Sequence, residues 1–431
     1  MEPLQITYKI LSSGIFLTCF PPFWLYTRMK GRYTMGLKER LGFVPRSLTR
    51  QVRGSPRIWI HGVSLGEVRV AASLIAALQK RIPGCTVLLS TTTEHGRKLA
   101  TQTFREDIPV LFAPIDTVFA VKKALSRVRP HVMVFLETEI WPTWLSEANK
   151  MGARIALVNG RISTRSLGHY LRFRFFFREV LKNVHAFSMI SKGDADRIKA
   201  MGADPQKVRI NGNAKYDLLA AEVDPGMEKK IREILNLQNS HTVFIAGSTR
   251  AGEEAIVLDA YEKIRERFPE TILILAPRHI VRVSDIGVLL GKRGLSYQVW
   301  SQLRGGQSKR TGPVVIIDTF GDLFDLYSVA TVVFCGASLV PLGGQNPLEP
   351  AAWGKMVLYG PSMEDFIDAK ALLEEIGAGI TVSNSNMLAE RAIWLFDHPH
   401  ELEICGARAQ AAIINHRGAA ERHTEVIASL L

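Results

Sequence analysis

The sequence predicts an α/β protein with two doubly wound domains that face each other across a cleft, preceded by a short membrane-associated segment. Beyond residue 57, short apolar runs alternate with amphipathic stretches, which is the pattern of a parallel sheet covered by helices. The pattern stops over the polar residues 216–240 and then begins again. We therefore expect a membrane segment at 1–34 and domains at 35–220 and 221–431.

The two halves also open alike. "IWIHGVSLGEV" and "VFIAGSTRAGEEA" each read as a strand, a glycine-containing turn and a helix. The remaining elements follow in order from the apolar runs and the helical periodicity. Further candidate strands are 85–92, 110–114, 131–137, 154–160 and 186–191, then 271–279, 313–318, 331–338 and 356–361; helical patterns occupy 67–81, 118–129 and 143–152.

Composition narrows the class of protein. With 431 residues and 47% hydrophobic content, the chain can bury two cores of ordinary domain size. Its four cysteines, Cys19, Cys85, Cys335 and Cys405, lie far apart, which argues against a zinc site or a disulfide framework and fits a reducing compartment. The net charge of +13 favours an anionic partner, which nucleic acid, an acidic membrane face or a phosphorylated ligand would each satisfy.

The N-terminal stretch 10–26 carries no charge, is rich in aromatic residues and is followed by Arg28, Lys30 and Arg32. Pro21 and its neighbouring proline would break a straight helix, so an interfacial segment and a true crossing both stay open. Small-residue cleavage signals are missing, and the cationic flank places the following chain in the cytoplasm. The alternative is a buried N-terminal helix of a soluble protein.

Ligands of doubly wound sheets bind at the carboxyl ends of the strands, where loops converge with helix N-termini. We therefore collected the polar residues at those ends. Carboxylates gather in the first half, and groups suited to a phosphate or a nucleotide gather in the second. They are Ser64, Gly66, Glu67, Glu137, Glu139, 159–161 and 213–215 in the first half, and Ser248, Thr249, Arg278, His279, 320–322 and 343–350 in the second.

The residues alone leave two roles open for Glu67. "SLGE" is a good capping box, in which Ser64 and Glu67 satisfy each other's backbone N–H groups, but a glutamate after a strand can also do chemistry. Glu137 ends a continuously apolar strand, where a buried carboxylate needs a partner or a task. Glu139 could be an ordinary acid of an early helical turn.

Two further patterns favour structural roles. Asp194 and Asp196 resemble a metal-binding motif, but a helix start explains them better. The stretch 172–182 mixes basic and aromatic residues; at helical spacing, Phe173, Phe176, Phe177 and Val180 are predicted to form a core stripe, with contact to a membrane as the alternative.

Eight ordered motifs carry a family resemblance: "ERLGF", "HGVSLGEV", "LETEIWP", "NGRIS", "GNAKYD", "AGSTRAGEE", "APRH" and "GGQNPLEPAAWGK". From about residue 35 to the C-terminus, the chain resembles the 3-deoxy-D-manno-octulosonic acid (Kdo) transferases of Gram-negative bacteria. The resemblance implies a GT-B type glycosyltransferase with two Rossmann-like domains. It implies transfer of Kdo from CMP-Kdo to the glucosamine-based lipid A precursor (lipid IVA), at the cytoplasmic face of the inner membrane, with an anionic lipid surface as partner and no nucleic acid.

The resemblance also implies roles for individual residues. Glu67 matches the family's general base, and Glu137 and Lys215 match its transition-state stabilisers, in an inverting displacement that needs no metal and no cofactor. Gln345 departs from the histidine of many members, although both side chains can hydrogen-bond. The residues expected to bind CMP-Kdo are Ser248, Thr249, Pro277, Arg278, His279, Phe320, Gly321, Asp322, Asn346, Pro347, Leu348 and Glu349.

Two other functions remain open at this stage. A nucleotide-sugar isomerase, such as a UDP-sugar 2-epimerase, shares the paired architecture and similar glutamates. A non-catalytic protein that binds a membrane surface through its basic charge would leave the "NPLE" and "LETE" groups without a purpose.

Overall fold

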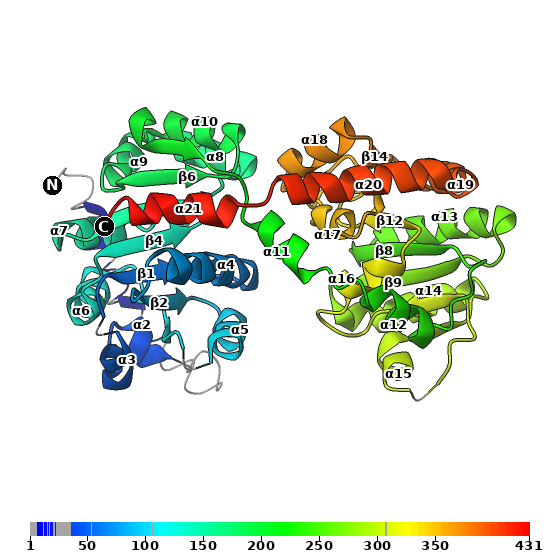
Figure 1. The fold of residues 1–431 in the computed structure, drawn as a ribbon, viewed down its shortest axis with the longest axis horizontal. Coiled ribbons are helices and arrows are strands. Elements are labelled where there is room, and N and C mark those ends of the chain that lie inside the picture. The colour runs from blue at the N-terminus through cyan, green and yellow to red at the C-terminus, as the bar shows by residue number, and fades with distance from the viewer. Residues whose placement is uncertain are drawn as a thin grey trace. The chain divides into compact units, whose positions relative to one another are not determined.

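The computed structural model describes residues 7–11, 13, 14, 16, 18, 19, 22, 36–52, 54–105, 107–306 and 308–431. It divides into two compact units, one made of Met1–Leu218 with His416–Leu431 and the other of Leu219–Asn415 (Figure 1). The division falls two residues before the expected boundary after residue 220. Residues 416–431, which we expected in the second domain, belong to the first unit.

Among the described residues, the first unit contains a sheet of seven strands in the order β3-β2-β1-β4-β5-β6-β7. All pairs are parallel. The strands are β1 (Arg57–His61), β2 (Thr86–Thr91), β3 (Val110–Phe112), β4 (Val132–Leu136), β5 (Arg154–Gly160), β6 (Ala186–Met189) and β7 (Val208–Ile210).

The second unit repeats this plan. Its sheet, as far as the chain is described, has seven parallel strands in the order β10-β11-β9-β8-β12-β13-β14. The strands are β8 (Val243–Thr249), β9 (Ile272–Pro277), β10 (Tyr297–Val299), β11 (Val314–Ile316), β12 (Val332–Cys335), β13 (Met356–Tyr359) and β14 (Gly379–Thr381). The predicted α/β fold with two doubly wound parallel sheets is confirmed.

Helices cover both faces of each sheet (Figure 1), which explains why the central strands are continuously apolar. In the first unit, Trp59 and Phe135 pack on one face, and Ile60 and Val134 pack on the other. The helices of this unit are α2 (Leu37–Arg40), α3 (Arg46–Gln51), α4 (Leu65–Arg81), α5 (Glu94–Phe104), α6 (Val118–Val128), α7 (Pro142–Lys150), α8 (Thr164–Arg172), α9 (Arg174–Leu181), α10 (Lys192–Met201) and α21 (Ala419–Ala428). Helix α11 (Lys215–Glu222) crosses the division, and the second unit contains α12 (Met227–Ile234), α13 (Glu253–Arg267), α14 (Val283–Lys292), α15 (Trp300–Arg304), α16 (Leu323–Leu326), α17 (Leu348–Ala352), α18 (Ile367–Glu375), α19 (Ser385–Asp397) and α20 (Pro399–Asn415).

Helix α21, drawn in red in Figure 1, packs beside α4 of the first unit. The carboxylate of Asp217 accepts the N–H groups of Gly418 and Ala420 at the start of α21, the latter at 2.8 Å. His423 bonds the Ser188 hydroxyl at 2.6 Å and the Gly212 carbonyl at 2.9 Å. These contacts explain why the C-terminal helix joins the first unit.

The predicted membrane segment 1–34 lies largely outside the described residues. At its beginning, the Tyr8 hydroxyl donates to Asp116 at 2.9 Å, and the buried Lys9 ammonium lies 2.5 Å from Glu147 of α7. Within the described part of the chain, no helix is long and apolar enough to cross a membrane.

Strand order determines where a site can form. In the first sheet, β1 and β4 are neighbours, and the chain continues from β1 to β2 on one side and from β4 to β5 on the other. In the second sheet, β8 and β12 stand in the same relation. Such reversal points leave a crevice at the carboxyl ends of the two strands, where ligands of this class of sheet bind.

Candidate active site

Glu67 lies in the first turn of α4, directly after the carboxyl end of β1. Ser64 caps this helix: its hydroxyl accepts the Glu67 N–H at 3.4 Å, and Glu67 Oε2 accepts the N–H groups of Ser64, at 3.2 Å, and of Val63. The capping box therefore forms. It engages Oε2 and leaves Oε1 for another partner, so capping and chemistry are compatible at this side chain.

The environment of Glu67 suits a general base. The residue is only 8% exposed, and burial raises the pKa of its carboxyl to about 7, with the negative charges of Glu137 and Glu139 adding to the shift. The N–H groups of Val63 and Ser64 act in the opposite direction. A carboxylate with a pKa near the working pH is effective in general base catalysis.

Glu137 follows β4, the neighbour of β1, with a left-handed backbone at φ 52°. Its carboxylate forms an ion pair with Lys215, whose Nζ lies 2.7 Å from Oε1. The pair brings together the two residues that the resemblance names as transition-state stabilisers. Left-handed geometry costs a non-glycine residue of order 1–3 kcal/mol and concentrates at functional sites.

Asn159 places the loop that carries Lys215. This buried residue is the last but one of β5 and has φ 51°, and its side-chain oxygen accepts the Ala214 N–H at 2.9 Å. The Asn213 side chain accepts the N–H of Lys215 itself at 3.0 Å. The two asparagines thereby place the start of α11 beside Glu137.

Glu139 is more than an acid of an early helical turn. Its carboxylate accepts the indole N–H of Trp141 at 2.5 Å and lies 3.9 Å from Nε2 of the buried His61. Burial raises the pKa of Glu139 and lowers the pKa of His61 to about 4, so this histidine is neutral at pH 7. Among the described residues, the structure thus brings together the carboxylates of Glu67, Glu137 and Glu139, the ammonium of Lys215 and the uncharged imidazole of His61.

In the second unit, Ser248 and Thr249 end β8, and Pro277 ends the adjacent strand β9. A bulge before Thr249 accompanies a left-handed Ser248 at φ 56°. The Arg278 N–H donates to the Thr249 carbonyl at 3.0 Å, and the Arg278 side chain is exposed. His279 Nε2 lies 2.5 Å from the Arg250 guanidinium. This edge therefore presents the exposed Arg278 and the partly exposed Ser248 to an anionic ligand, whereas Thr249 is buried.

Two further groups lie at the same edge of the second sheet. After β11, Phe320 is 74% exposed and Gly321 has φ 93°, while the Asp322 carboxylate is bound to Arg304 at 2.5 Å and to the Thr319 hydroxyl at 2.5 Å. Asp322 therefore stabilises this turn and leaves Phe320 to face solvent.

After β12, Asn346 lies just before the short helix α17: its side-chain oxygen accepts the Leu348 N–H at 3.2 Å, and its amide donates to Glu349 at 3.3 Å. Pro347 precedes α17, and Gln345 precedes Asn346. The structure thus places the predicted donor-binding residues after β8, β9, β11 and β12. Of the predicted catalytic residues, Glu67 follows β1 and Glu137 follows β4, and Lys215 of α11 pairs with Glu137.

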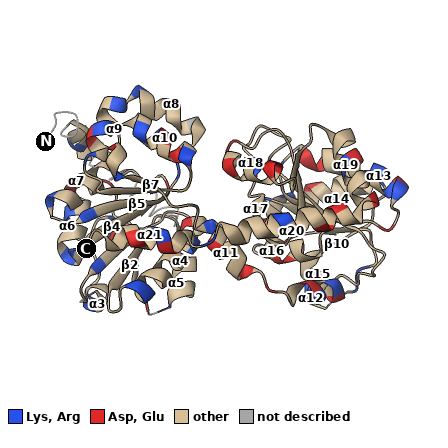
Figure 2. Cartoon of the chain, turned by 45° about the horizontal axis from the view of Figure 1, so that its top comes forward, with Lys and Arg blue, Asp and Glu red and all other residues tan. Residues whose placement is uncertain are grey.

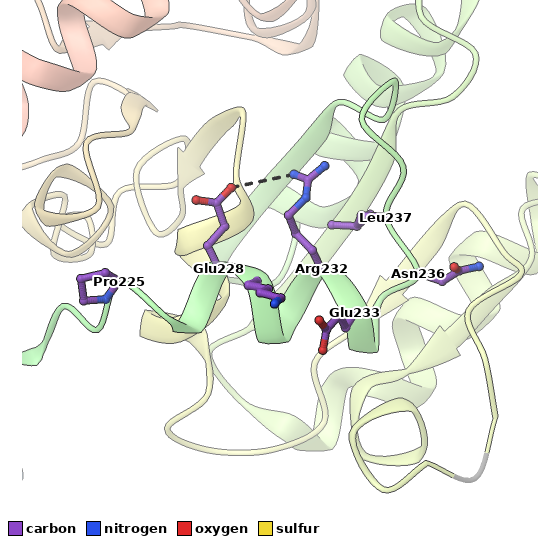
Figure 3. A pocket seen from close by; sticks show the side chains of 7 residues that line it. Pro225, Glu228, Arg232, Glu233, Asn236 and Leu237 are labelled. Atoms are coloured by element: carbon purple, nitrogen blue, oxygen red, sulfur yellow. Dashed lines mark ion pairs between the residues drawn. The ribbon is translucent and has the colours of Figure 1, made fainter.

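Other features do not form a site. Figure 3 shows a shallow surface pocket along α12, where Glu228 and Arg232 already pair at 3.9 Å. Asp194 is buried and accepts the Ile162 N–H at 2.7 Å, which confirms its structural role. In the described part of the chain, no group of three His, Cys, Asp or Glu side chains could hold a metal ion.

Comparison with known proteins identifies the family. A family model described as "3-Deoxy-D-manno-octulosonic-acid transferase (kdotransferase)" matches residues 35–218. The 3-deoxy-D-manno-octulosonic acid transferase of Rickettsia conorii is 31% identical over 82% of this chain and 74% of its own. The chain belongs to the Kdo transferase family. It is therefore a glycosyltransferase, and the resemblance of the sequence motifs is confirmed.

Other Kdo transferases match at greater length. The enzyme of Haemophilus influenzae is 27% identical over 97% of this chain and 98% of its own. The chain spans about half the length of a bifunctional glycosyltransferase/methyltransferase of Fusobacterium nucleatum, which is 32% identical over 79% of this chain and 53% of its own.

Solved structures show the fold of this Kdo transferase. A glycosyltransferase from Rickettsia africae and the UDP-GlcNAc 2-epimerase of Neisseria meningitidis each align with a TM-score of 0.61, at 14% identity, over 87% of this chain and 98–99% of theirs. Because both a transferase and an epimerase share this fold, the fold alone does not choose between the two activities. The family of the sequence makes that choice.

Proposed function

We propose that this Kdo transferase moves Kdo from CMP-Kdo to a hydroxyl of the glucosamine-based lipid A precursor (lipid IVA), with inversion at the anomeric carbon and without a metal ion. The observation that carries the proposal is geometric: the buried Glu67 carboxyl follows β1, and the Glu137–Lys215 ion pair follows the neighbouring strand β4. Burial also raises the pKa of Glu67 to about 7. A carboxyl group with a pKa near 7 can accept the proton of an attacking hydroxyl, and a fixed cation in the same site can stabilise negative charge that develops in the transition state.

The proposed reaction is a single displacement. The acceptor hydroxyl gives its proton to Glu67 as its oxygen forms a bond to the anomeric carbon of Kdo. The bond from that carbon to the CMP phosphate oxygen breaks, and CMP leaves with the electron pair. A positioned base of this kind contributes on the order of 10² to 10⁴ in rate.

The second unit supplies the donor-binding groups in this proposal. Arg278 has the charge to bind a phosphate, and the partly exposed Ser248 lies at the end of the same pair of strands. Thr249 is buried, so in this proposal it supports the site through its backbone. Glu349, in the first turn of α17, is suited to accept hydrogen bonds from the ribose hydroxyls. Exposed Phe320 offers a flat surface to a base.

We also propose that the enzyme works at the cytoplasmic face of the inner membrane. Helices α8 and α9 support this location: Phe173 and Phe175 are 57% and 82% exposed, and Arg172 and Arg174 are exposed beside them. The prediction of Phe173 as a core residue was therefore wrong, although Val180 of the same stripe is buried. Figure 2 shows basic positions on these helices, all of them arginines, which suit an anionic lipid surface.

The direct test incubates the purified full chain with CMP-Kdo and tetraacylated lipid A precursor and weighs the lipid product. We expect a product heavier by one or more Kdo units, together with free CMP. A second incubation with UDP-GlcNAc should yield no epimer. Epimer formation, or an unchanged lipid with CMP-Kdo intact, would reject the proposal.

A further inference from the structure

Glu253 and Glu254 open helix α13 and are both completely buried, at 0% exposure. An acid in a first helical turn usually stays at the surface, where the helix dipole alone favours it. Fully buried glutamates are rare unless they are paired, because removing a charge from water is costly. These two residues therefore have partners beyond their own helix, and each is bound to a different loop.

Glu253 binds the chain that follows β12. Its Oε2 accepts the N–H of Ala337 at 2.6 Å and of Arg250 at 2.9 Å. Its Oε1 accepts the N–H groups of Ser338 and Leu339, both at 2.9 Å. One carboxylate thus joins the turn after β8 to the turn after β12, from which the chain runs on to Asn346–Glu349.

The backbone at this junction is under strain. Ser248 at φ 56° and Ala337 at φ 58° are both left-handed, and strain of this kind persists only where the surroundings hold it. Gly336 lies against β8 so closely that a Cβ atom there would be 2.7 Å from the Ser248 carbonyl oxygen. The N–H groups of residues 337–339 donate to Glu253, and these bonds help to hold Ala337 in its left-handed conformation.

Glu254 binds the chain that follows β9. Its two oxygens accept Nε and Nη2 of Arg282 at 3.0 and 3.1 Å, a bidentate pair that raises the pKa of Arg282. The Thr249 hydroxyl also donates to Glu254 at 3.4 Å. Arg282 closes the segment that begins with Pro277–His279, so Glu254 ties that segment to the end of β8.

We propose that Glu253 and Glu254 are positioning residues for the nucleotide sugar: they touch no donor, and they hold the loops after β8, β9 and β12 in one arrangement that binds CMP. This inference rests on the proposed function, because it takes those loops to be the donor site. It assigns Glu253 to the loop that leads to Asn346–Glu349, and Glu254 to the loop of Arg278.

The first experiment needs no ligand. Amide hydrogen exchange of Glu253→Gln should be at least about tenfold faster at 337–339, because the new NH₂ group cannot accept the N–H groups that one carboxylate oxygen now accepts. Glu254→Gln should instead speed amide hydrogen exchange at residues 277–282. The matched control is Glu262→Gln, which removes an exposed ion pair of the same helix with Arg293, 3.0 Å away, and should loosen neither loop.

The second experiment measures donor binding. Glu253→Gln and Glu254→Gln should each lower the affinity for CMP by about tenfold and raise KM for CMP-Kdo by a similar factor. The kcat at saturating donor and the KM for the acceptor should stay nearly unchanged. Arg282→Lys keeps the charge but loses the bidentate pairing, so it should fall between Glu254→Gln and the unsubstituted enzyme. A role in overall stability alone would not separate the two KM values.

The outcomes are distinguishable. If Glu253→Gln does not fold, Glu254→Gln and Arg282→Lys still decide the matter. Unchanged exchange in both loops overturns the inference, and so does CMP binding within twofold of the unsubstituted enzyme. If the unsubstituted protein does not bind CMP while the loops loosen as expected, the donor assignment fails and the positioning of the loops stands.

Discussion

The ammonium of Lys215 lies 2.7 Å from Oε1 of Glu137, although one residue begins α11 and the other directly follows β4. The contact forms because β5 is the neighbour of β4 in the sheet. Near the end of β5, the Asn159 side chain accepts the N–H of Ala214, the residue just before Lys215. The contact places a fixed positive charge beside Glu137, whose own negative charge contributes to the raised pKa of Glu67. The ion pair is therefore the centre of the proposed chemistry in the first unit.

Removing the positive charge of Lys215 should slow Kdo transfer without lowering the affinity for the donor. Because Lys215 is a preorganised charge in a partly buried site, Lys215→Met should lower kcat by on the order of 10²–10³. CMP affinity, measured by calorimetry, should stay within about twofold. Lys192→Met, at the start of α10 on the same unit, is the control and should keep normal kcat. If Lys215→Met retained full kcat, Lys215 would have no role in the transfer reaction.

The pH dependence of transfer should report the pKa of Glu67. Only the deprotonated carboxylate can accept the acceptor's proton, so kcat/KM should fall about tenfold per pH unit below about 7 and level off above it. Glu67→Gln should abolish this limb and lower kcat by on the order of 10²–10⁴, since glutamine keeps the capping box but accepts no proton. Glu94→Gln, an exposed acid at the start of α5, should change neither. Substantial turnover in Glu67→Gln would leave Glu67 as a helix cap only.

Glu67→Gln should also raise the free energy of unfolding, but only at high pH. The folded pKa of Glu67, about 7, lies above its ordinary value of 4.5, so the folded state binds this proton more tightly and stability is lost as pH rises between the two values. Glu67→Gln removes that loss. Its free energy of unfolding in urea should exceed that of the unsubstituted protein by about 1–3 kcal/mol at pH 8 and match it near pH 4.5. An equal effect at both pH values would contradict the assigned shift.

The start of the N-terminal segment should stabilise the first unit. Asp116 accepts the Tyr8 hydroxyl and also the N–H groups of Thr143 and Trp144 at the start of α7, which follows Glu139 closely in the chain. Tyr8→Phe should therefore lower the free energy of unfolding by about 1–3 kcal/mol, the usual loss for a hydrogen bond to a charged group. The control is Ile10→Ser at a 66% exposed position, where we expect a change within about 0.5 kcal/mol. Equal effects of both substitutions would reject a specific role for Tyr8.

Much of the fold could be read from local patterns. The apolar runs of β1, β4, β8 and β12 are continuous because helices cover both faces of each sheet. A strand that is buried on both faces can be recognised in the sequence by such a run. The strands that sequence reasoning missed, β7, β10 and β14, are three residues long and lie at sheet edges. So short a strand carries no periodicity to detect.

Motif order predicted the family, which is confirmed. It also pointed to Glu67, Glu137 and Lys215, which follow strands whose carboxyl ends share one edge of a parallel sheet, and their roles in transfer stay predictions. The roles of Glu253 and Glu254 were not accessible in this way. In the sequence they are ordinary acids of a first helical turn, and their partners 337–339 and Arg282 are distant along the chain.

Residues 416–431 show the same limit. An amphipathic helix needs an apolar surface to cover, but its own pattern does not say which sheet provides it. That depends on Asp217, Ser188 and Gly212, whose contacts with α21 exist only once the chain has folded. Patterns within a few residues of one another thus specify elements and motifs, whereas partners far apart in the chain are chosen by packing, burial and hydrogen bonding in three dimensions.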